Sequence, residues 1–313
     1  MNNLLKQTAI DIESILKKEE DEGSSNDNFF ALANITKELL PTKQYSREQL
    51  LEIWKNYRTS NERQNIFRLE PLLQEFKEIR GIENLKKCCE EGGVFGTFHY
   101  GDYRHVPFQI TKSLQMDKTN SLNIVVDQDS YNSEIELKKW NKLREKYNVK
   151  YIVSEEENSG LKLLRLLRKG RSILLYLDGN TGSGDDSQPF NVQHITSTVH
   201  IRSGIFRLVQ LLKKPMCIVI ADKNANGESR LTAYKPITVN KDTLKKSIDY
   251  SYELFRNKLV EQPELWRFWF RHHRYVKEWD NIHINETHIQ NIDWFNNKKE
   301  FGLDLETGNI FKI

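Results

Sequence analysis

From about residue 82 to residue 260, short apolar runs alternate with amphipathic stretches, and this alternation constrains the fold more than any other feature of the chain. The runs SILLYL (172–177) and PMCIVIA (215–221) are almost continuously apolar, which is typical of parallel strands that helices cover on both faces. The apolar runs predict strands at 94–98, 123–126, 149–153, 173–177, 216–221 and 230–236. The amphipathic stretches predict helices at 82–90, 134–147, 160–168, 200–212 and 242–260. We therefore expect an α/β fold with a mixed, mostly parallel central sheet and helices on both faces.

The residues before this region predict an added helical N-terminal region over 1–75. Apolar residues spaced three and four apart predict an amphipathic helix in residues 1–18, and further helices are expected at 46–57 and 71–79. The charged and polar run at 19–28 predicts a solvated linker. We assign an α/β domain to 76–280 and a C-terminal tail to 281–313, with a hairpin that turns at Thr307-Gly308-Asn309.

Composition limits the class of protein. A chain of 313 residues with 38% hydrophobic and 29% charged residues is typical of a globular protein and excludes a fibrous or low-complexity one. The net charge of +3 gives little general attraction to nucleic acid. Three cysteines, two of them adjacent, exclude a disulfide framework and favour a reducing compartment.

The expected location is the cytoplasm, because the chain shows neither an export signal nor a run of about 18 apolar residues. The amphipathic helix at 1–18 is expected to pack on its own domain or on a dimer mate. Peripheral contact of that helix with the inner face of the membrane is the alternative.

Two of the predicted strands end at residues that can do acid-base chemistry. The strand at 94–98 is followed by His99, and the strand at 173–177 is followed by Asp178. Reactive groups in doubly wound α/β proteins gather beyond the carboxyl ends of the strands. A neutral imidazole there can take a proton from an attacking group, and a carboxylate can fix its tautomer, so His99 is the first candidate for a general base. A structural role for His99, and a turn or cap role for Asp178, stay open on spacing alone.

The segment that contains His99, IRGIENLKKCCEEGGVFGTFHYGDYRH (79–105), resembles the core of the bacterial lysophospholipid acyltransferase superfamily, in particular its lipid A late (lauroyl/myristoyl) acyltransferase branch. In that branch a short helix leads into a strand ending in a His, and an Asp or Glu follows five residues later. Later segments are similar in order as well: NIVVDQ, KYIVS, LLRLLRKGRSILLYLDGN, TSTVHIRSGIFRLVQLLKKPMCIVIAD and QPELWRFWFRHHR. The resemblance covers roughly residues 78–279.

The resemblance implies transfer of an acyl chain from a thioester, on an acyl carrier protein or coenzyme A, to a hydroxyl or amine. His99 would be the general base, and neither a cofactor nor a metal is implied. Arg104 and Arg202 are the candidates for stabilising the oxyanion. The candidates for donor binding are Arg271, Arg274 and Trp269, because family members carry a similar basic and aromatic segment. A lipid, a peptide and a small amine are all open as the acceptor.

The chain departs from the family pattern at one position, because Arg104 stands where the family has its acid. An arginine cannot accept the imidazole N–H, and its charge weakens His99 as a base. In a first account Asp102 replaces the acid, since residues three apart can share one face of a helix that starts there. In a second account Asp178 replaces it. In a third the base function is weakened or lost, which would leave an enzyme with a less demanding acceptor or a non-catalytic acyl-thioester-binding or scaffold protein. We favour Asp102.

The run WRFWFRHHRYVK (266–277) interleaves basic and aromatic residues. It fits a helix with an aromatic core face and a basic solvent face, a donor-docking surface, or a site for single-stranded nucleic acid, in that order of preference. We expect no nucleic-acid partner. His272 and His273 point in different directions on a helix, and no spacing of His and Cys matches a zinc site, so no metal is expected.

Overall fold

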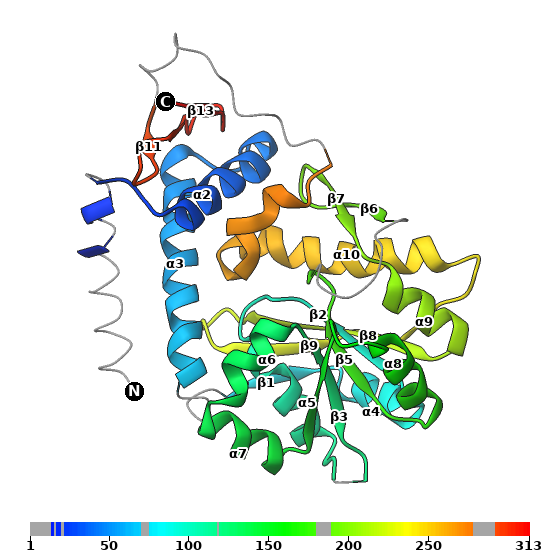
Figure 1. Cartoon of the computed structure of the whole chain (residues 1–313). Helices are drawn as coiled ribbons and strands as arrows, with labels where there is room; N and C mark the ends of the chain where they lie inside the picture. Colours follow the sequence, from blue (N-terminus) through cyan, green and yellow to red (C-terminus); the bar gives the residue numbers. More distant parts are fainter. Residues whose placement is uncertain are drawn as a thin grey trace. The chain divides into compact units, whose positions relative to one another are not determined.

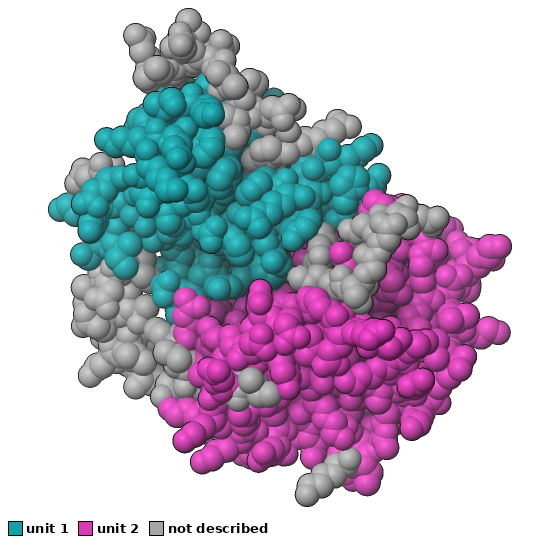
Figure 2. All heavy atoms as spheres, viewed as in Figure 1, with its two compact units in different colours: residues 1–63, 191–200, 256–313 teal, residues 64–190, 201–255 magenta. Residues whose placement is uncertain are grey.

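The computed structural model describes residues 14–15, 17–19, 22–69, 75–117, 119–179, 189–277 and 292–313, and its elements are labelled in Figure 1. The chain divides into two compact units, which Figure 2 colours separately. Unit 1 contains residues 1–63, 191–200 and 256–313, and unit 2 contains residues 64–190 and 201–255. Each unit is therefore built from more than one stretch of the chain. Among the described residues, no helix has both the length and the apolar composition that crossing a bilayer requires.

Unit 2 is built on an eight-stranded, mostly parallel sheet, which confirms the predicted α/β fold class. Its strands are β1 (Glu78–Arg80), β2 (Val94–Thr97), β3 (Leu122–Val126), β4 (Val149–Val153), β5 (Ile173–Tyr176), β8 (Pro215–Lys223), β9 (Ser229–Ala233) and β10 (Ile237–Thr238). Seven of them follow the order β1-β9-β8-β2-β5-β3-β4, and β10 pairs with β8. The pairs that β8 forms with β9 and β10 are antiparallel, whereas β2 is parallel to both of its neighbours.

Helices cover both faces of this sheet. They are α4 (Ile82–Glu90), α5 (Val106–Ser113), α6 (Gln128–Ile135), α7 (Lys138–Lys146), α8 (Ser159–Arg168), α9 (Gly204–Leu212) and α10 (Leu244–Glu261), with the short turn η3 (Tyr103–His105) before α5. Phe95 and Phe98 point to opposite faces because side chains alternate along a strand. Phe95 belongs to a buried cluster with side chains of α4, α5 and α7, and Phe98 stacks on Phe255 of α10 at 4.1 Å between ring centroids. This double cover explains why the central strands are continuously apolar.

Unit 1 combines helices with two small sheets. It holds α2 (Asn26–Leu39), η1 (Leu40–Thr42), most of α3 (Arg47–Leu69), η4 (Pro263–Leu265) and η5 (Arg267–Arg274). One sheet pairs β6 (Phe190–Gln193) with β7 (Thr198–Ile201), and the other contains β11 (Trp294–Phe295), β12 (Phe301–Leu303) and β13 (Ile310–Lys312). Helix α2 packs against η5, and its buried face includes Phe29, Leu32, Ile35 and Leu39.

Most predicted elements of the α/β region are found, with different bounds. The six predicted strands correspond to β2, β3, β4, β5, β8 and β9. The predicted helix at 134–147 is divided into the end of α6 and the whole of α7, and the predicted helix at 200–212 begins only at Gly204, after β7. The predicted helix at 71–79 is wrong at its end, where residues 78–79 belong to β1; residues 70–74 lie outside the described residues.

The predicted linker at 19–28 is wrong, because α2 already begins at Asn26. The Ser25 hydroxyl caps this helix, and the buried Ser24 forms a backbone bridge with Asn296. The expected helix at 1–18 lies largely outside the described residues.

The antiparallel pair of β12 and β13 is the hairpin predicted near the C-terminus. The units do not follow the predicted boundaries after residues 75 and 280, because residues 191–200 and 256–277 pack in unit 1.

Candidate functional site

His99 and Asp178 form a hydrogen-bonded pair in unit 2, just beyond the carboxyl ends of two neighbouring parallel strands. Strands β2 and β5 are in register with Thr97 opposite Tyr176, so the residues two positions further along stand side by side. Nδ1 of His99 lies 2.9 Å from Oδ1 of Asp178. The His99 backbone N–H also donates to Oδ1 and Oδ2 of that carboxylate, at 3.1 and 3.0 Å. One carboxylate therefore holds both the backbone and the ring of His99.

Two aromatic rings fix the plane of the His99 imidazole. It stacks on Tyr176 with ring centroids 4.2 Å apart, and it meets the edge of the Tyr103 ring at 5.0 Å. The Tyr176 hydroxyl in turn donates to the Tyr103 carbonyl oxygen at 3.2 Å. The side chain of His99 is 17% exposed and that of Asp178 is 5% exposed. Because the carboxylate accepts the proton on Nδ1, the neutral ring has its lone pair on Nε2, as a general base requires.

Asp102, which the sequence analysis favours as the partner of His99, is tied to other elements of unit 2. Its Oδ2 lies 2.6 Å from Nζ of Lys223, at the end of β8, and accepts a hydrogen bond from the hydroxyl of Ser229. Its Oδ1 accepts from the side-chain amide of Gln64 at 2.9 Å. This buried carboxylate therefore joins the end of α3 to β8 and β9.

The prediction that Asp102 and His99 share one face of a helix is wrong. Gly101 adopts a positive φ of 55°, and the first helical turn, η3, begins only at Tyr103. The backbone between His99 and Asp102 is therefore a bend. Of the two carboxylates considered, the structure places Asp178 against the imidazole ring.

Arg104 is paired with Glu134 of α6. Its guanidinium donates to Oε1 of Glu134, and the Tyr151 hydroxyl donates to Oε2 at 2.7 Å. Burial acts to lower the pKa of Arg104, but Tyr103 and Glu134 outweigh burial and hold the pKa above its ordinary value. The guanidinium of Arg104 therefore has a carboxylate partner in α6. The predicted role of Arg104 in stabilising an oxyanion stays a prediction.

The residues predicted to bind the donor do not share one environment. Trp269 of η5 is fully buried, and its indole N–H donates to the Pro263 carbonyl oxygen at 2.7 Å. Such an enclosed side chain cannot stack on a ligand, so the prediction for Trp269 is wrong and it is a core residue. Arg271 lies over the Phe268 ring, 3.4 Å from its centroid, and Arg274 is exposed. The donor-binding role of these two arginines stays a prediction.

Two further features of unit 2 are Arg202 and a pocket beside β3 and β4. Arg202 lies between β7 and α9, and its oxyanion role likewise stays a prediction. A pocket of about 390 Å³ lies beside β3 and β4, and its lining includes Lys150, Lys162 and Arg171 but none of the predicted site residues. Its lining offers positive charge and no imidazole or carboxylate, so His99 and Asp178 remain the candidate for acid-base chemistry.

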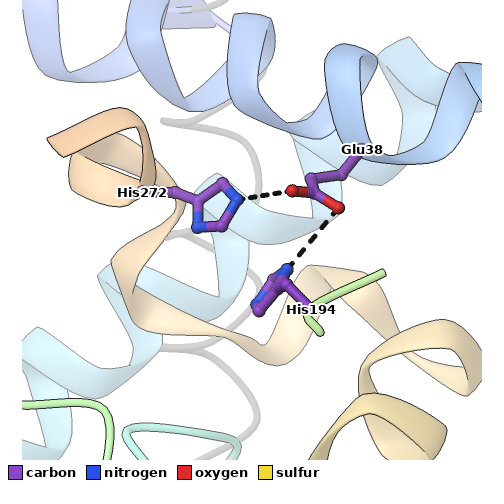
Figure 3. Close-up of side chains that lie close together, drawn as sticks. All are labelled: Glu38, His194 and His272. Atoms are coloured by element: carbon purple, nitrogen blue, oxygen red, sulfur yellow. Dashed lines mark hydrogen bonds and ion pairs between the residues drawn. The ribbon is translucent and has the colours of Figure 1, made fainter. Parts of the chain in front are cut away.

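A second cluster of titratable side chains lies in unit 1 and is drawn in Figure 3. Glu38 comes from α2, His194 from the turn after β6, and His272 from η5; their side chains are 2%, 3% and 1% exposed. Nε2 of His272 lies 2.6 Å from Oε1 of Glu38, and Nδ1 of His194 lies 3.6 Å from Oε2. Sequence analysis misses this cluster, because its members are far apart in the chain. His273 does point elsewhere, as expected, and stacks on Phe30 at 4.5 Å.

The turn between β6 and β7 supplies further hydrogen bonds to the Glu38 carboxylate. The backbone N–H groups of Thr196 and Ser197 donate to Oε2 at 2.8 and 3.3 Å, and the Ser197 hydroxyl donates to Oε1. Burial acts to raise the pKa of Glu38, but His194 and His272 outweigh it and hold the pKa well below its ordinary value. Burial lowers the pKa of His272. Near neutral pH the cluster therefore contains an ionised Glu38 and a neutral His272.

The two clusters differ in what they can do. The pair in unit 2 offers an imidazole oriented by a carboxylate and still partly exposed. The cluster in unit 1 offers one carboxylate and two imidazoles in a closed environment, which suits a bound cation or a structural hydrogen-bond network. Comparison with known proteins gives no match for this chain, either among protein-family models or among curated proteins.

Proposed function

We propose that the chain is an acyltransferase that moves an acyl group from a thioester donor, an acyl carrier protein or coenzyme A, to a hydroxyl or amine acceptor. The observation that carries this proposal is the pair of His99 and Asp178, in which a buried carboxylate accepts the Nδ1 proton of an imidazole at a strand end. The resemblance of residues 79–105 to bacterial lysophospholipid acyltransferases supports it, because that family has its base at the end of the corresponding strand.

In the proposed reaction, Nε2 of His99 takes a proton from the acceptor as its oxygen or nitrogen attacks the thioester carbonyl carbon. A C–O or C–N bond forms, and the resulting tetrahedral oxyanion collapses and breaks the C–S bond. The leaving sulfur takes the proton from the imidazolium, so a free thiol and neutral His99 result. Asp178 stabilises the imidazolium between these steps because its carboxylate lies 2.9 Å from Nδ1.

The proposal also includes the surroundings of the reaction. Arg271 and Arg274 would attract the acidic surface of a carrier protein, and this attraction would weaken as salt screens it. Arg104 or Arg202 would stabilise the oxyanion. The acceptor would be a lipid, a peptide or a small amine, and the protein would work in the cytoplasm or at the inner face of the membrane.

The test compares the full-length protein with His99→Gln on a panel of acyl-carrier-protein and acyl-CoA thioesters, with a cell extract as the source of acceptor. Thiol release gives the turnover, and the mass of the product identifies the acyl chain and the acceptor. We expect the substitution to lower turnover by about 10²–10⁴-fold, as loss of a general base does. His200→Gln, at a half-buried histidine of unit 1, is the matched control and should keep turnover. Turnover by His99→Gln equal to that of the unaltered protein would contradict the proposal.

The alternative is a non-catalytic acyl-thioester-binding or scaffold protein. The observation that favours it is Arg104 at the position of the family's acid. The same assay separates the two functions. Tight binding of one thioester with no thiol release, whatever extract is supplied, would support the binding or scaffold function and contradict the acyltransferase.

A further inference from the structure

Glu38, His194 and His272 bring together three separate parts of the chain within unit 1, namely α2, the turn after β6 and η5 (Figure 3). Glu38 and His272 are 234 residues apart in the sequence, yet their side chains lie in hydrogen-bond contact. None of the three takes part in the chemistry proposed for His99. Burying three titratable groups at one place is costly unless each group is satisfied, so their convergence calls for a physical explanation.

The surroundings of the three side chains are aromatic and closed. The His194 ring lies 4.9 Å from Trp266, the His272 ring lies 5.7 Å from Trp269, and the two imidazoles are 4.3 Å apart. A dry shell of this kind limits solvent access to a metal bound inside it. The backbone donors of the β6–β7 turn hold the Glu38 carboxylate in place, as outer hydrogen bonds commonly do for metal ligands.

We propose that Glu38, His194 and His272 bind a divalent transition-metal ion, with Zn²⁺ as the first candidate. Imidazole together with carboxylate suits Zn²⁺ and its neighbours in the first transition row, whereas Ca²⁺ and Mg²⁺ prefer ligand sets made of oxygen. One ligand atom from each of the three residues already lies within 4.8 Å of the other two. This proposal is independent of the acyl-transfer reaction.

The adjustment that the ion requires is small. With zinc-ligand distances of about 2.0–2.1 Å, two ligands of a tetrahedral ion are about 3.3 Å apart. The separation of 3.6 Å between His194 Nδ1 and Glu38 Oε2 is close to that value. The 2.6 Å between His272 Nε2 and Glu38 Oε1 must open by about 0.7 Å, as the proton between these atoms gives way to the metal.

The Ser197 hydroxyl lies beside Glu38 and His272, where a further ligand could bind. The Ser197 hydroxyl contacts Glu38 Oε1 and lies 3.4 Å from His272 Nε2, so it can act as a fourth ligand or hold a water there. The ion would link α2, the β6–β7 hairpin and η5, and so stabilise unit 1.

The test measures zinc binding by the full-length protein, purified without a histidine tag and without chelators. Elemental analysis gives the metal content as purified, and the metal-free protein is then titrated with Zn²⁺ against a chromophoric chelator. We expect about one equivalent per chain, with affinity lowered more than about 100-fold in Glu38→Gln, His194→Gln and His272→Gln. His273→Gln is the matched control, since it changes the neighbouring histidine that stacks on Phe30, and it should bind like the unaltered protein.

A titration of the unaltered, metal-free protein with Co²⁺ gives a second measurement that does not depend on the variants folding. Four-coordinate nitrogen and oxygen ligation should give intense visible absorption bands, which Zn²⁺ then abolishes. A protein that contains no stoichiometric metal and gives no such bands would overturn the proposal, and the cluster would be a hydrogen-bond network only. Zinc bound equally well by all three folded glutamine variants would place the ion elsewhere and would also overturn it.

Discussion

At the scale of single residues, the His99 imidazole depends on one carboxylate for both its position and its tautomer. Replacing Asp178 by Asn keeps the size of the side chain and removes the charge that stabilises an imidazolium. An amide can also present its NH₂ group to Nδ1 and so select the wrong tautomer. We expect Asp178→Asn to lower thioester turnover by about 10²–10⁴-fold, while the melting temperature changes little.

Asp102→Asn is the matched comparison, and it should show the opposite pattern. The substitution replaces the buried carboxylate that contacts the Lys223 ammonium with a neutral amide. We expect a loss of about 3–5 kcal/mol in the free energy of unfolding, measured by denaturant titration, with turnover of the folded protein retained. If Asp102→Asn abolished turnover and Asp178→Asn did not, the roles assigned to these carboxylates would be reversed.

The cysteines offer a test of burial in the core of unit 2. Burial raises the pKa of Cys88 well above its ordinary value and raises that of Cys217 to about 12, whereas Cys89 is partly exposed. At pH 8 only about one Cys217 side chain in 10⁴ is a thiolate, the form that reacts. We expect a disulfide reagent to modify Cys89 first in the native protein and the other two only after denaturation. Rapid reaction of all three thiols in the folded protein would contradict the packing described.

The sequence places both members of the candidate dyad at strand ends, but it cannot choose between the two carboxylates. That choice depends on β2 and β5 lying side by side in register, although His99 and Asp178 are 79 residues apart. Local spacing favours Asp102 instead, but that expectation is wrong because the backbone bends at Gly101 and does not continue into a helix there. The cluster around Glu38 has no local signal in the sequence, because each of its three side chains comes from a different segment.

At the scale of elements, the bend after β2 depends on a glycine. Gly101 has a φ of 55°, and a Cβ atom there would lie 2.3 Å from the carbonyl oxygen of Ala221. Gly101→Ala should therefore lower the free energy of unfolding by about 2–4 kcal/mol, through backbone strain together with overpacking. Gly227→Ala is the control, because Gly227 also has a positive φ of 72° but an added Cβ would meet nothing within 4 Å. We expect it to cost about 1 kcal/mol, and equal losses in the two variants would contradict the close contact.

The strands of the sheet are easier to predict than the helices that surround them. Strands β2, β5 and β8 are buried on both faces, so their apolar runs are continuous in the sequence. Strand β1 has three residues and an exposed Arg80, which leaves no such run. Helix α2 is missed because its capping serine and polar first turn resemble a linker, although the rest of the helix is buried.

At the scale of the whole molecule, the eight-stranded sheet and its core belong to one unit although the chain leaves that unit at residues 191–200. A polypeptide of residues 64–261 keeps every strand of the sheet and all of α10. We expect it to unfold in a single cooperative thermal transition, followed by circular dichroism. A polypeptide of residues 64–214 lacks β8, β9 and β10 and should show no such transition. Non-cooperative melting of the longer polypeptide would show that the sheet needs unit 1 to fold.

The division into interleaved units could not be predicted from the sequence. Composition changes along the chain suggest boundaries between consecutive segments, such as the one assigned after residue 75. The packing of α2 against η5 instead joins residues from opposite ends of the chain. Such long-range pairing leaves no trace in local periodicity, since both segments are amphipathic whichever partner they have.

The sequence separation of 234 residues from Glu38 to His272 also sets an order of events during synthesis. At about 5–20 residues per second, the carboxylate leaves the ribosome roughly 10–50 s before its imidazole partner. During that interval the apolar face of α2 has no η5 to pack against, while every strand of the sheet in unit 2 is made. Helix α2 is therefore synthesised before the sheet of unit 2, yet its packing is completed only after every strand of that sheet has been made.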